Sequence, residues 1–582
     1  MHAFFAQVRP NGVQADDAMR AGDWSVVGSA RIDNREEIRS WTGASATASD
    51  LALIASAIAS RGQVCVRNIL GDFAFVAVNS VTRQTIAARD AFGVRALYYR
   101  TTPDGLAFSS HAARLSDNAE YDLDYIAEFI LSGFDRDHRT PYRGVRAFPP
   151  GHVLVAENGN TTLTRYWAAA DFQPAEHASA EESCAQFRDL LERAVLSNLT
   201  GADDTWSQLS GGLDSSSLVS LAETMRRTGR VSHGIAGTVM MVDSLDDESS
   251  YARMVVEHCG VRFETVTDYW LWQDDGAPPP LNDLPDPLYP MYARNRAFCS
   301  IIRGAGGRVL FSGVGPDHFV AGNLYFFADW LARGRVLETI HELWRWSLLG
   351  KKPFWKYAID NAIAPLLPSR LRRLAAPRWA QVYDWISPTF ARGLGLNDRT
   401  AWNRALNEAP FGHKFAGQIA ADIDHLVVCV DRGEFENGIE MRCPYLYRPL
   451  VEFCLRLPRE LRIESATKKW VMREAMKGVL PEVVRTRRDK GAINGRTRWT
   501  LSREGATIGR MLKSSILAEL GCIDISKVRQ AIERARTGDD TVLFAVTRTL
   551  ALEFWLQVTS HRWGVRGGLT TDSAASTLAV AV

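Results

Sequence analysis

The feature that most constrains the fold is a change of pattern near residue 184. From there to residue 317, short β-type runs alternate with amphipathic helical segments, and "HGIAGTVMMV" is one such run. Helices are predicted within 246–260 and around 291–303. Alternation of this kind predicts a parallel sheet covered by helices, with ligands bound beyond the carboxyl ends of the strands. The pattern from about 320 to 565 is mainly helical.

Residues 1–168 have a different pattern, with short β-type runs such as "GDFAFVAVN" separated by Gly, Asn and Pro turns. One helix is predicted over 49–62, because it opens on a Ser-Asp cap and ends in glycine. This pattern predicts an antiparallel α+β domain. Residues 169–183 are small and polar and are interpreted as a linker to a second domain over 184–565. Residues 566–582 are expected to be a disordered tail.

Composition narrows the function classes. The 582-residue chain has a net charge of +1, which gives no support for nucleic-acid binding. Its eight cysteines are scattered without metal-ligand spacing, as is typical of reduced thiols in a cytosol. No cleavable signal and no apolar run of about 18 residues is found, so a membrane span is not expected. These observations predict a cytoplasmic protein.

The string "SGGLDSS" (210–216) is the first that suggests chemistry. Adjacent glycines allow a tight turn, and serine hydroxyls and a helix N-terminus add donors for a phosphate. A carboxylate at Asp214 would repel that phosphate unless a cation lies between them, which favours Mg²⁺. The alternative is an ordinary strand-to-helix turn with an Asp or Ser cap.

The loop resembles the pyrophosphate-binding loop of ATP pyrophosphatases, and the chain resembles the asparagine synthetase B family from end to end. The matching stretches include "GDFAFVAVNSVTRQTIAARDAFGVRALYYR", "SGGLDSS", "DDES", "SGVGPD", "NGIEMRCPYLYRPLVEFCLRLP", "TKKWVMREAMKGVLP" and "RRDKG", in that order. The resemblance implies an N-terminal glutaminase-like sandwich of the N-terminal-nucleophile type. It implies a C-terminal ATP-pyrophosphatase domain of the adenine nucleotide alpha hydrolase-like class. It also implies AMP-forming amide ligation with ATP and Mg²⁺.

Departures from the family pattern indicate which branch the chain resembles. The glutaminase nucleophile would be a cysteine at position 2, and the chain has His2 there. The glutamine-binding strings of the family are missing as well, so the first domain is expected to be structural and not to release ammonia. In the second loop, Val314 stands where asparagine synthetases carry Glu and β-lactam synthetases carry Tyr, and His318 replaces the final Glu.

These departures favour resemblance to the lasso-peptide cyclases, whose acceptor amine arrives on the substrate. The implied reaction adenylates an Asp or Glu side chain of a leader-cleaved precursor peptide and joins it to the peptide's own N-terminal amine. A leader peptidase and a leader-recognition protein are the implied partners. Two alternatives remain: another amide ligase of the family acting on a small carboxylate, a β-lactam precursor or an envelope sugar acid, and a non-catalytic ATP-binding scaffold.

The resemblance implies roles for particular residues. Asp214 and Asp317 would hold Mg²⁺, Lys490 would stabilise the oxyanion, and Glu440 would accept or hold the amine proton. Lys490 could instead belong to a solvated basic run, and Glu440 to a buried ion pair with Arg442 or Arg473. The residues implied for ATP binding are Leu209, Ser210, Gly211, Gly212, Asp214, Ser215, Thr238, Ser312 and Gly313.

The segment 323–360 carries apolar and aromatic residues at roughly helical spacing, from Phe327 to Trp344. Most such stripes lie in a core. The alternatives are a surface that grips the substrate peptide, or one that contacts a membrane surface through basic and aromatic residues.

Overall fold

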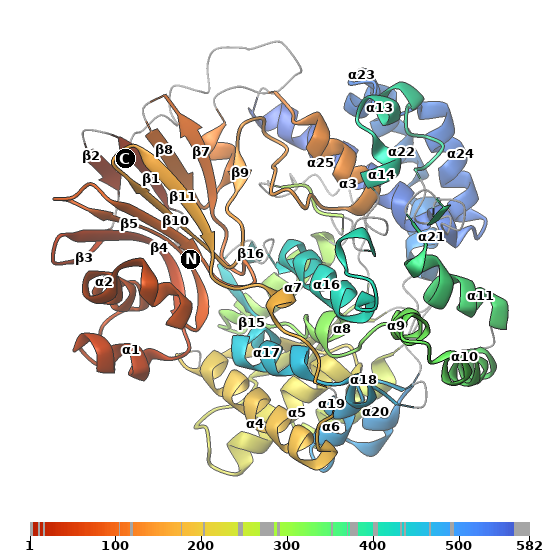
Figure 1. Cartoon of the computed structure of the whole chain (residues 1–582), viewed down its shortest axis with the longest axis horizontal. Helices are drawn as coiled ribbons and strands as arrows, with labels where there is room; N and C mark the ends of the chain where they lie inside the picture. Colours follow the sequence, from red (N-terminus) through yellow and green to blue (C-terminus); the bar gives the residue numbers. More distant parts are fainter. Residues whose placement is uncertain are drawn as a thin grey trace.

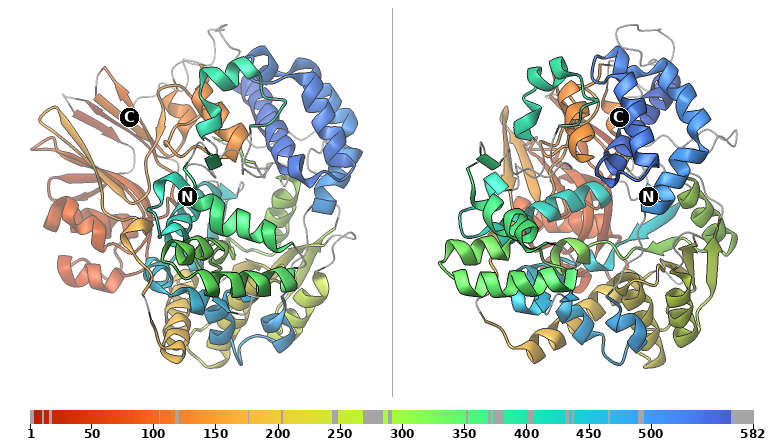
Figure 2. Two further views of the ribbon diagram at one scale, coloured as in Figure 1. Left: turned by 45° about the vertical axis from the view of Figure 1, so that its right-hand side comes forward. Right: turned by 90° about the vertical axis from the view of Figure 1, so that its right-hand side faces the viewer.

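The computed structural model contains two α/β domains that pack side by side, with most of the helical additions around the second (Figures 1 and 2). The described residues are 4–9, 12–15, 18–103, 105–116, 120–175, 177–201, 204–242, 248–267, 284–287, 292–350, 353–368, 371–372, 382–399, 406–430, 434–435, 438–464, 467–488 and 494–563. The predicted tail at 566–582 lies outside them, as do His2 and Lys490.

The N-terminal domain is a sandwich of two antiparallel sheets. Their strand orders are β2-β1-β8-β7-β9 and β11-β10-β6-β5-β4-β3. The strands are β1 (Phe5–Arg9), β2 (Gly12–Ala15), β3 (Met19–Ala21), β4 (Trp24–Ile32), β5 (Gly71–Asn79), β6 (Thr85–Arg89), β7 (Tyr98–Thr102), β8 (Gly105–Ser109), β9 (Arg146–Ala147), β10 (His152–Glu157) and β11 (Asn160–Arg165). Alternate side chains of the two sheets form a shared core that includes Val76, Phe108 and Leu154.

Helices α1 (Arg35–Thr42) and α2 (Asp50–Arg61) cover the outer face of the six-stranded sheet (Figure 1). The predicted helix over 49–62 is confirmed, because the Ser49 side chain caps α2 by accepting a hydrogen bond from the amide of Ala52. Helix α3 (Leu123–Ser132) packs instead against α25 (Asp540–Trp563) near the other end of the chain.

The second domain contains the predicted parallel sheet, in the order β14-β13-β12-β15-β17-β16, with only the edge strand β16 antiparallel. Its strands are β12 (Thr205–Gln208), β13 (Gly237–Met241), β14 (Phe263–Val266), β15 (Val309–Phe311), β16 (Glu434–Phe435) and β17 (Ile439–Arg442). The helices that follow or cover them are α4 (Ala180–Leu199), α5 (Leu213–Arg227), α6 (Ser249–Cys259), α7 (Tyr292–Gly304) and α8 (Pro316–Phe319). Helix α4 begins four residues before the predicted boundary at 184, because the Ser179 side chain caps it.

The remainder is mainly helical, as predicted. It comprises α9 (Phe326–Ala332), α10 (Val336–Gly350), α11 (Phe354–Ala358), α13 (Pro388–Gly393), α14 (Leu396–Arg399), α16 (Lys414–Val430), α17 (Arg448–Arg456), α18 (Arg459–Arg462), α19 (Trp470–Ala475), α20 (Glu482–Thr486), α21 (Asn494–Arg503), α22 (Gly505–Met511), α23 (Ile516–Glu519), α24 (Ile525–Arg536) and α25, with a short hairpin of β18 (Ile463–Glu464) and β19 (Thr467–Lys468).

Helix α25 has the length and composition of a membrane span over Asp540–Ser560, with a mean hydropathy of 1.2. Two thirds of that window is buried inside the protein, where Leu550 and Trp555 belong to a core cluster. This helix therefore has the burial of a core helix.

The two domains share hydrophobic cores. Phe92 and Trp167 of the first domain belong to the same buried cluster as Phe187 and Leu450 of the second. A second cluster joins α3 to α24 and α25. The domains are therefore fixed against each other by two apolar clusters that both domains share.

Candidate active site

Two glycine-rich loops meet at the carboxyl ends of β12 and β15. The first, Ser210–Ser216, opens α5, and the second, Ser312–Asp317, leads into α8. A Cβ added at Gly313 would lie 3.0 Å from the backbone nitrogen of Ser215, so the two loops are in close contact. Both loops therefore lie where the sequence analysis expects ligands to bind, beyond the carboxyl ends of the parallel strands.

The first loop requires glycine at position 211. Gly211 has φ +69°, and a Cβ there would lie 2.9 Å from backbone atoms of Glu248 and Ala252. Inside the loop, the Ser215 hydroxyl accepts a hydrogen bond from the Ser210 amide at 3.1 Å and lies 3.2 Å from the Ser210 hydroxyl. The loop is therefore preorganised at the positive end of a 15-residue helix, a geometry that suits a phosphate.

The carboxylates of Asp214 and Asp317 converge on the ammonium group of Lys469. Its Nζ atom lies 2.8 and 2.6 Å from the two oxygens of Asp214 and 2.7 Å from Asp317 Oδ1. Burial lowers the pKa of Lys469, but the two carboxylates more than offset this and raise it above its ordinary value. A charged amine therefore lies between the two aspartates.

This arrangement tests whether the aspartate pair fits a metal ion. Both carboxylates reach one point that a cation occupies, and oxygen ligands of this kind are those that Mg²⁺ prefers. The residues fit, provided that Lys469 withdraws from the shared point. Lys469 itself has φ 59°, an uncommon conformation for a residue other than glycine, at the start of α19.

The sequence analysis did not reveal this role of Lys469. Arg473, named there as a possible partner of Glu440, donates to the carbonyls of Lys468 and Arg485 and so joins α19 to α20. The sequence analysis also missed Tyr445, whose hydroxyl donates to the carbonyl of Asp214 at 2.9 Å and so supports the first loop.

The residues implied to line the adenosine differ in how close they lie to the two loops. Ser312 lies at the edge of the sheet, and its amide donates to the carbonyl of Arg442 at 2.9 Å. Leu209 is buried, with its amide bonded to Val239, so only its backbone borders the loop. Thr238 pairs with Ser207 inside the sheet, is fully buried, and donates its hydroxyl to the carbonyl of Arg262, so its side chain is occupied within the sheet and its role in lining adenosine stays a prediction.

Lys490 lies outside the described residues, but the segment before it is anchored beside the first loop. The guanidinium of Arg487 bonds the carboxylate of Glu248 and lies over the ring of Tyr251, 4.0 Å from its centroid. The Glu248 carbonyl is one of the atoms that crowd Gly211. Arg487 therefore lies beside residues that pack against the phosphate loop.

Glu440 is held in an ion pair, the alternative given for it in the sequence analysis. Arg442 donates to one oxygen at 3.1 Å, and Arg95 of the N-terminal domain donates to the other at 2.7 Å. Burial raises the pKa of Glu440, but the positive charges of Arg95 and Arg442 outweigh burial and lower the pKa from its ordinary 4.5 to about 2. A carboxylate held in this state is a weak base that remains charged.

The low pKa of Glu440 predicts a dependence of stability on pH. Its contribution is fully present above the ordinary pKa of 4.5 and is lost as the pH falls through the folded value of about 2. Between pH 5 and pH 3, Glu440→Gln should therefore lose less stability than the unchanged protein, by up to about 2 kcal/mol. Urea unfolding midpoints at both pH values measure this. Glu120→Gln, in an exposed pair with Arg143, is the control, and equal losses in all three proteins would refute the prediction.

The stripe within 323–360 is only partly core. Phe327 and Leu343 are buried in the main cluster. Leu337, Ile340 and Trp344 are exposed on α10, with 82 % of Leu337 accessible. The interpretation of the whole stripe as core is wrong for these three, because α10 packs through its other face.

Comparison with known proteins agrees with this geometry. The family model described as asparagine synthase matches residues 186–557, and that of a glutamine amidotransferase domain matches residues 19–167. The chain belongs to the asparagine synthase family. Members of the family are ATP-dependent carbon–nitrogen ligases, and the chain is an enzyme of that class.

Individual relatives are distant. An amidase, chyE, of Penicillium rubens is 24 % identical over 89 % of this chain and 83 % of its own length. An amidase, chry2, of Gibberella zeae is 22 % identical over the same shares. Asparagine synthetase 1 of Bacillus subtilis is 22 % identical over 79 % of this chain and 73 % of its own. The family rests on the match over residues 186–557, and relatives at these identities leave the substrate open.

Proposed function

We propose that the chain is a lasso-type macrolactam cyclase. It would activate an Asp or Glu side chain of a leader-cleaved peptide with ATP and close it onto the peptide's own N-terminal amine. The observation that carries the proposal is the contrast between the two domains. The synthetase loops retain both aspartates at one cation position, whereas His2 replaces the nucleophile that would release ammonia.

The residues divide the work as follows. The amides and hydroxyls of the first loop bind the phosphates of ATP, and Asp214 and Asp317 hold Mg²⁺, which offsets phosphate charge when bound. The substrate carboxylate attacks the α-phosphorus and pyrophosphate leaves. The peptide amine then attacks the acyl carbon, AMP leaves, and the amine gives up its proton.

Lys490 is proposed to stabilise the oxyanion in the second step, and Glu440 to hold the ammonium form of the amine before attack. Two observations support these roles. Arg487, close to Lys490 in the sequence, bonds Glu248 beside the first loop, and Glu440 remains ionised with 24 % of its side chain accessible. Val314, partly buried against the core, has no polar group with which to orient a small amine.

The exposed apolar face of α10 supports a peptide substrate. Leu337, Ile340, Trp344 and Leu348 are exposed at helical spacing on α10, a helix of the second domain that is labelled in Figure 1. A peptide held in a folded loop before closure needs such a surface, because proximity supplies much of the rate. A leader peptidase and a leader-recognition protein are the proposed partners.

The decisive experiment is mass spectrometry of a candidate precursor peptide incubated with the protein, a leader peptidase, ATP and Mg²⁺. Loss of one water from the core peptide, with equal AMP and pyrophosphate, would support macrolactam closure. An unchanged peptide together with turnover of a small carboxylate would overturn it. The second candidate, a ligase for a small carboxylate, is favoured by the amidase names of two fungal relatives.

Substitution of Lys490 tests the second step separately. Lys490→Ala should retain ATP binding but lower the rate of AMP release by about 10²- to 10³-fold, because one charged contact to the oxyanion is lost. Quenched time courses of AMP formation measure the rate, and calorimetric titration with Mg·ATP measures binding. Lys477→Ala is the control, because the side chain of Lys477 is exposed and paired with Glu474. Equal rates in both variants would exclude Lys490 from catalysis.

A further inference from the structure

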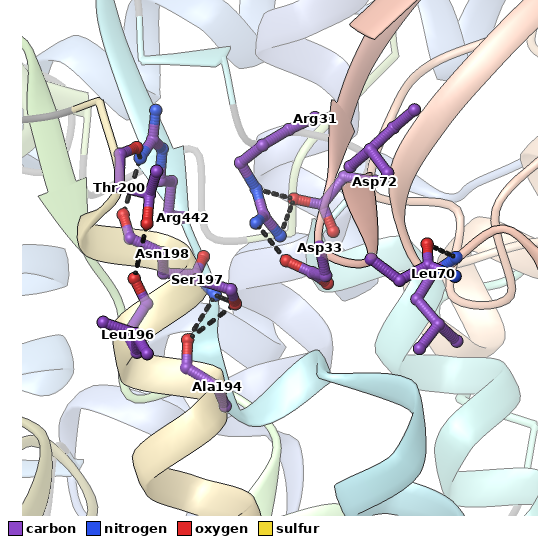
Figure 3. A network of polar contacts seen from close by, with 12 residues as sticks. Arg31, Asp33, Leu70, Asp72, Ala194, Leu196, Ser197, Asn198, Thr200 and Arg442 are labelled. Atoms are coloured by element: carbon purple, nitrogen blue, oxygen red, sulfur yellow. Dashed lines mark hydrogen bonds and ion pairs between the residues drawn. The ribbon is translucent and has the colours of Figure 1, made fainter. Parts of the chain in front are cut away.

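A continuous set of charged contacts crosses the domain interface at β17. Arg95, on the loop after β6, donates to Glu440 across the interface, and Arg442 donates to the other oxygen of the same carboxylate. Arg442 also donates to the carbonyls of Asn198 at 2.6 Å and Thr200 at 3.2 Å (Figure 3). One cation from each domain therefore holds Glu440.

The loop that carries Arg95 is rigid. The buried carboxylate of Asp90 accepts hydrogen bonds from the amides of Phe92, Val94 and Arg95. The buried guanidinium of Arg89 donates to the carbonyls of Gly93 and Arg95. Because the backbone is fixed at both ends, the side chain of Arg95, 5 % exposed, has a defined position relative to the second domain.

The same strand supports the second loop of the active site. Arg442 pairs with Phe311 in the sheet, and its carbonyl accepts the amide hydrogen of Ser312. Gly313, the next residue, contacts Ser215 of the first loop. A displacement of β17 would therefore move Ser312 through its bond to Arg442, and then Ser215 through its contact with Gly313.

Other charges of the N-terminal domain near β17 balance one another. Arg31 bonds Asp33 and Asp72 within its own domain (Figure 3). Docking of the two domains is provided by shared apolar clusters, and a buried ion pair is weak evidence for added stability. The contact of Arg95 with Glu440 is accordingly better explained by orientation of β17 than by adhesion.

We propose that Arg95 is a positioning residue of the synthetase site: it fixes Glu440 and β17, and through them the loop Ser312–Asp317, so that the N-terminal domain completes the ATP site without chemistry of its own. This inference rests on the proposed ATP-dependent ligation. It deepens that function by assigning a task to the domain that lacks the nucleophile.

The test measures the affinity of the full-length protein for Mg·ATP by calorimetric titration. Arg95→Gln should weaken binding about tenfold, and Arg95→Lys should stay within about threefold, because a lysine ammonium can still reach Glu440. Arg399→Gln is the matched control. Arg399 makes an equally buried interdomain ion pair with Glu128, but on α14 and α3, away from β17.

The outcomes separate the two proposals. Weakening in Arg95→Gln alone, with near recovery in Arg95→Lys, supports positioning. Equal weakening in Arg95→Gln and Arg399→Gln would overturn it in favour of general domain docking, as would normal binding in Arg95→Gln. If the unchanged protein failed to bind Mg·ATP, the proposed function would fall first. Should Arg95→Gln fail to fold, Arg95→Met against Arg399→Met gives the same comparison, and equal affinities would overturn the inference.

Discussion

Asp214→Asn should lower ATP-dependent amide formation by about three orders of magnitude, corresponding to about 4 kcal/mol of transition-state stabilisation. Asp214 provides two of the three oxygens around the shared cation position, at 2.6 and 2.8 Å from Lys469. An asparagine keeps the shape of the side chain but removes the charge that balances a divalent ion. The rate of AMP and pyrophosphate release, measured at saturating ATP, checks the prediction.

Asp189→Asn is the control, because its surface pair with Arg193 on α4 is exposed and far from both loops in the fold. Thermal unfolding of both variants separates loss of chemistry from loss of structure. If Asp214→Asn kept more than a tenth of the activity, the assignment of this aspartate to the metal would be wrong. Recovery by raising Mg²⁺ would instead support a weakened metal site.

The loops could be predicted from the sequence because their requirements are local. Gly211 has a positive φ and lies against the backbone of α6, so the string itself predicts a turn that only glycine tolerates. The strand-to-helix placement follows from hydrophobic periodicity on both sides. The predicted fold class of both domains was correct for the same reason.

Contacts between distant segments could not be predicted. Lys469 lies 255 positions from Asp214, and Arg95 lies 345 from Glu440. Motif matching places each residue in its own segment, but which cation meets which carboxylate depends on how domains and helices pack. The hydrogen bond from the Thr238 hydroxyl to the carbonyl of Arg262 could not be predicted from the sequence for the same reason, since it joins neighbouring segments of the sheet.

Periodicity likewise could not divide the aromatic segment between core and surface. The same spacing that buries Phe327 leaves Trp344 exposed, because a helix with apolar residues around most of its circumference covers a neighbour with only one face. The exposed face is therefore a property of the packing of α10 on the domain.

Lys469→Met should make the stability of the protein depend on divalent ions. Removing the ammonium leaves Asp214, whose side chain is 18 % exposed, facing Asp317, whose side chain is 54 % exposed. Because solvent screens their repulsion in part, the cost should fall below the value of about 3 to 5 kcal/mol for a fully buried charge that loses its partner. Mg²⁺ can replace the missing charge. We therefore expect a lower unfolding temperature in chelator, recovered largely by millimolar Mg²⁺, whereas the unchanged protein responds little.

Lys468→Met is the matched control, since this neighbouring lysine is exposed at the end of β19 and should show no such dependence. Differential scanning fluorimetry with and without Mg²⁺ is sufficient. A Lys469→Met protein destabilised equally in both conditions would mean that the aspartates do not form a cation site on their own. Recovery by Mg²⁺ would mean that lysine and metal compete for one position, and that Lys469 must leave it before ATP and its metal ion bind.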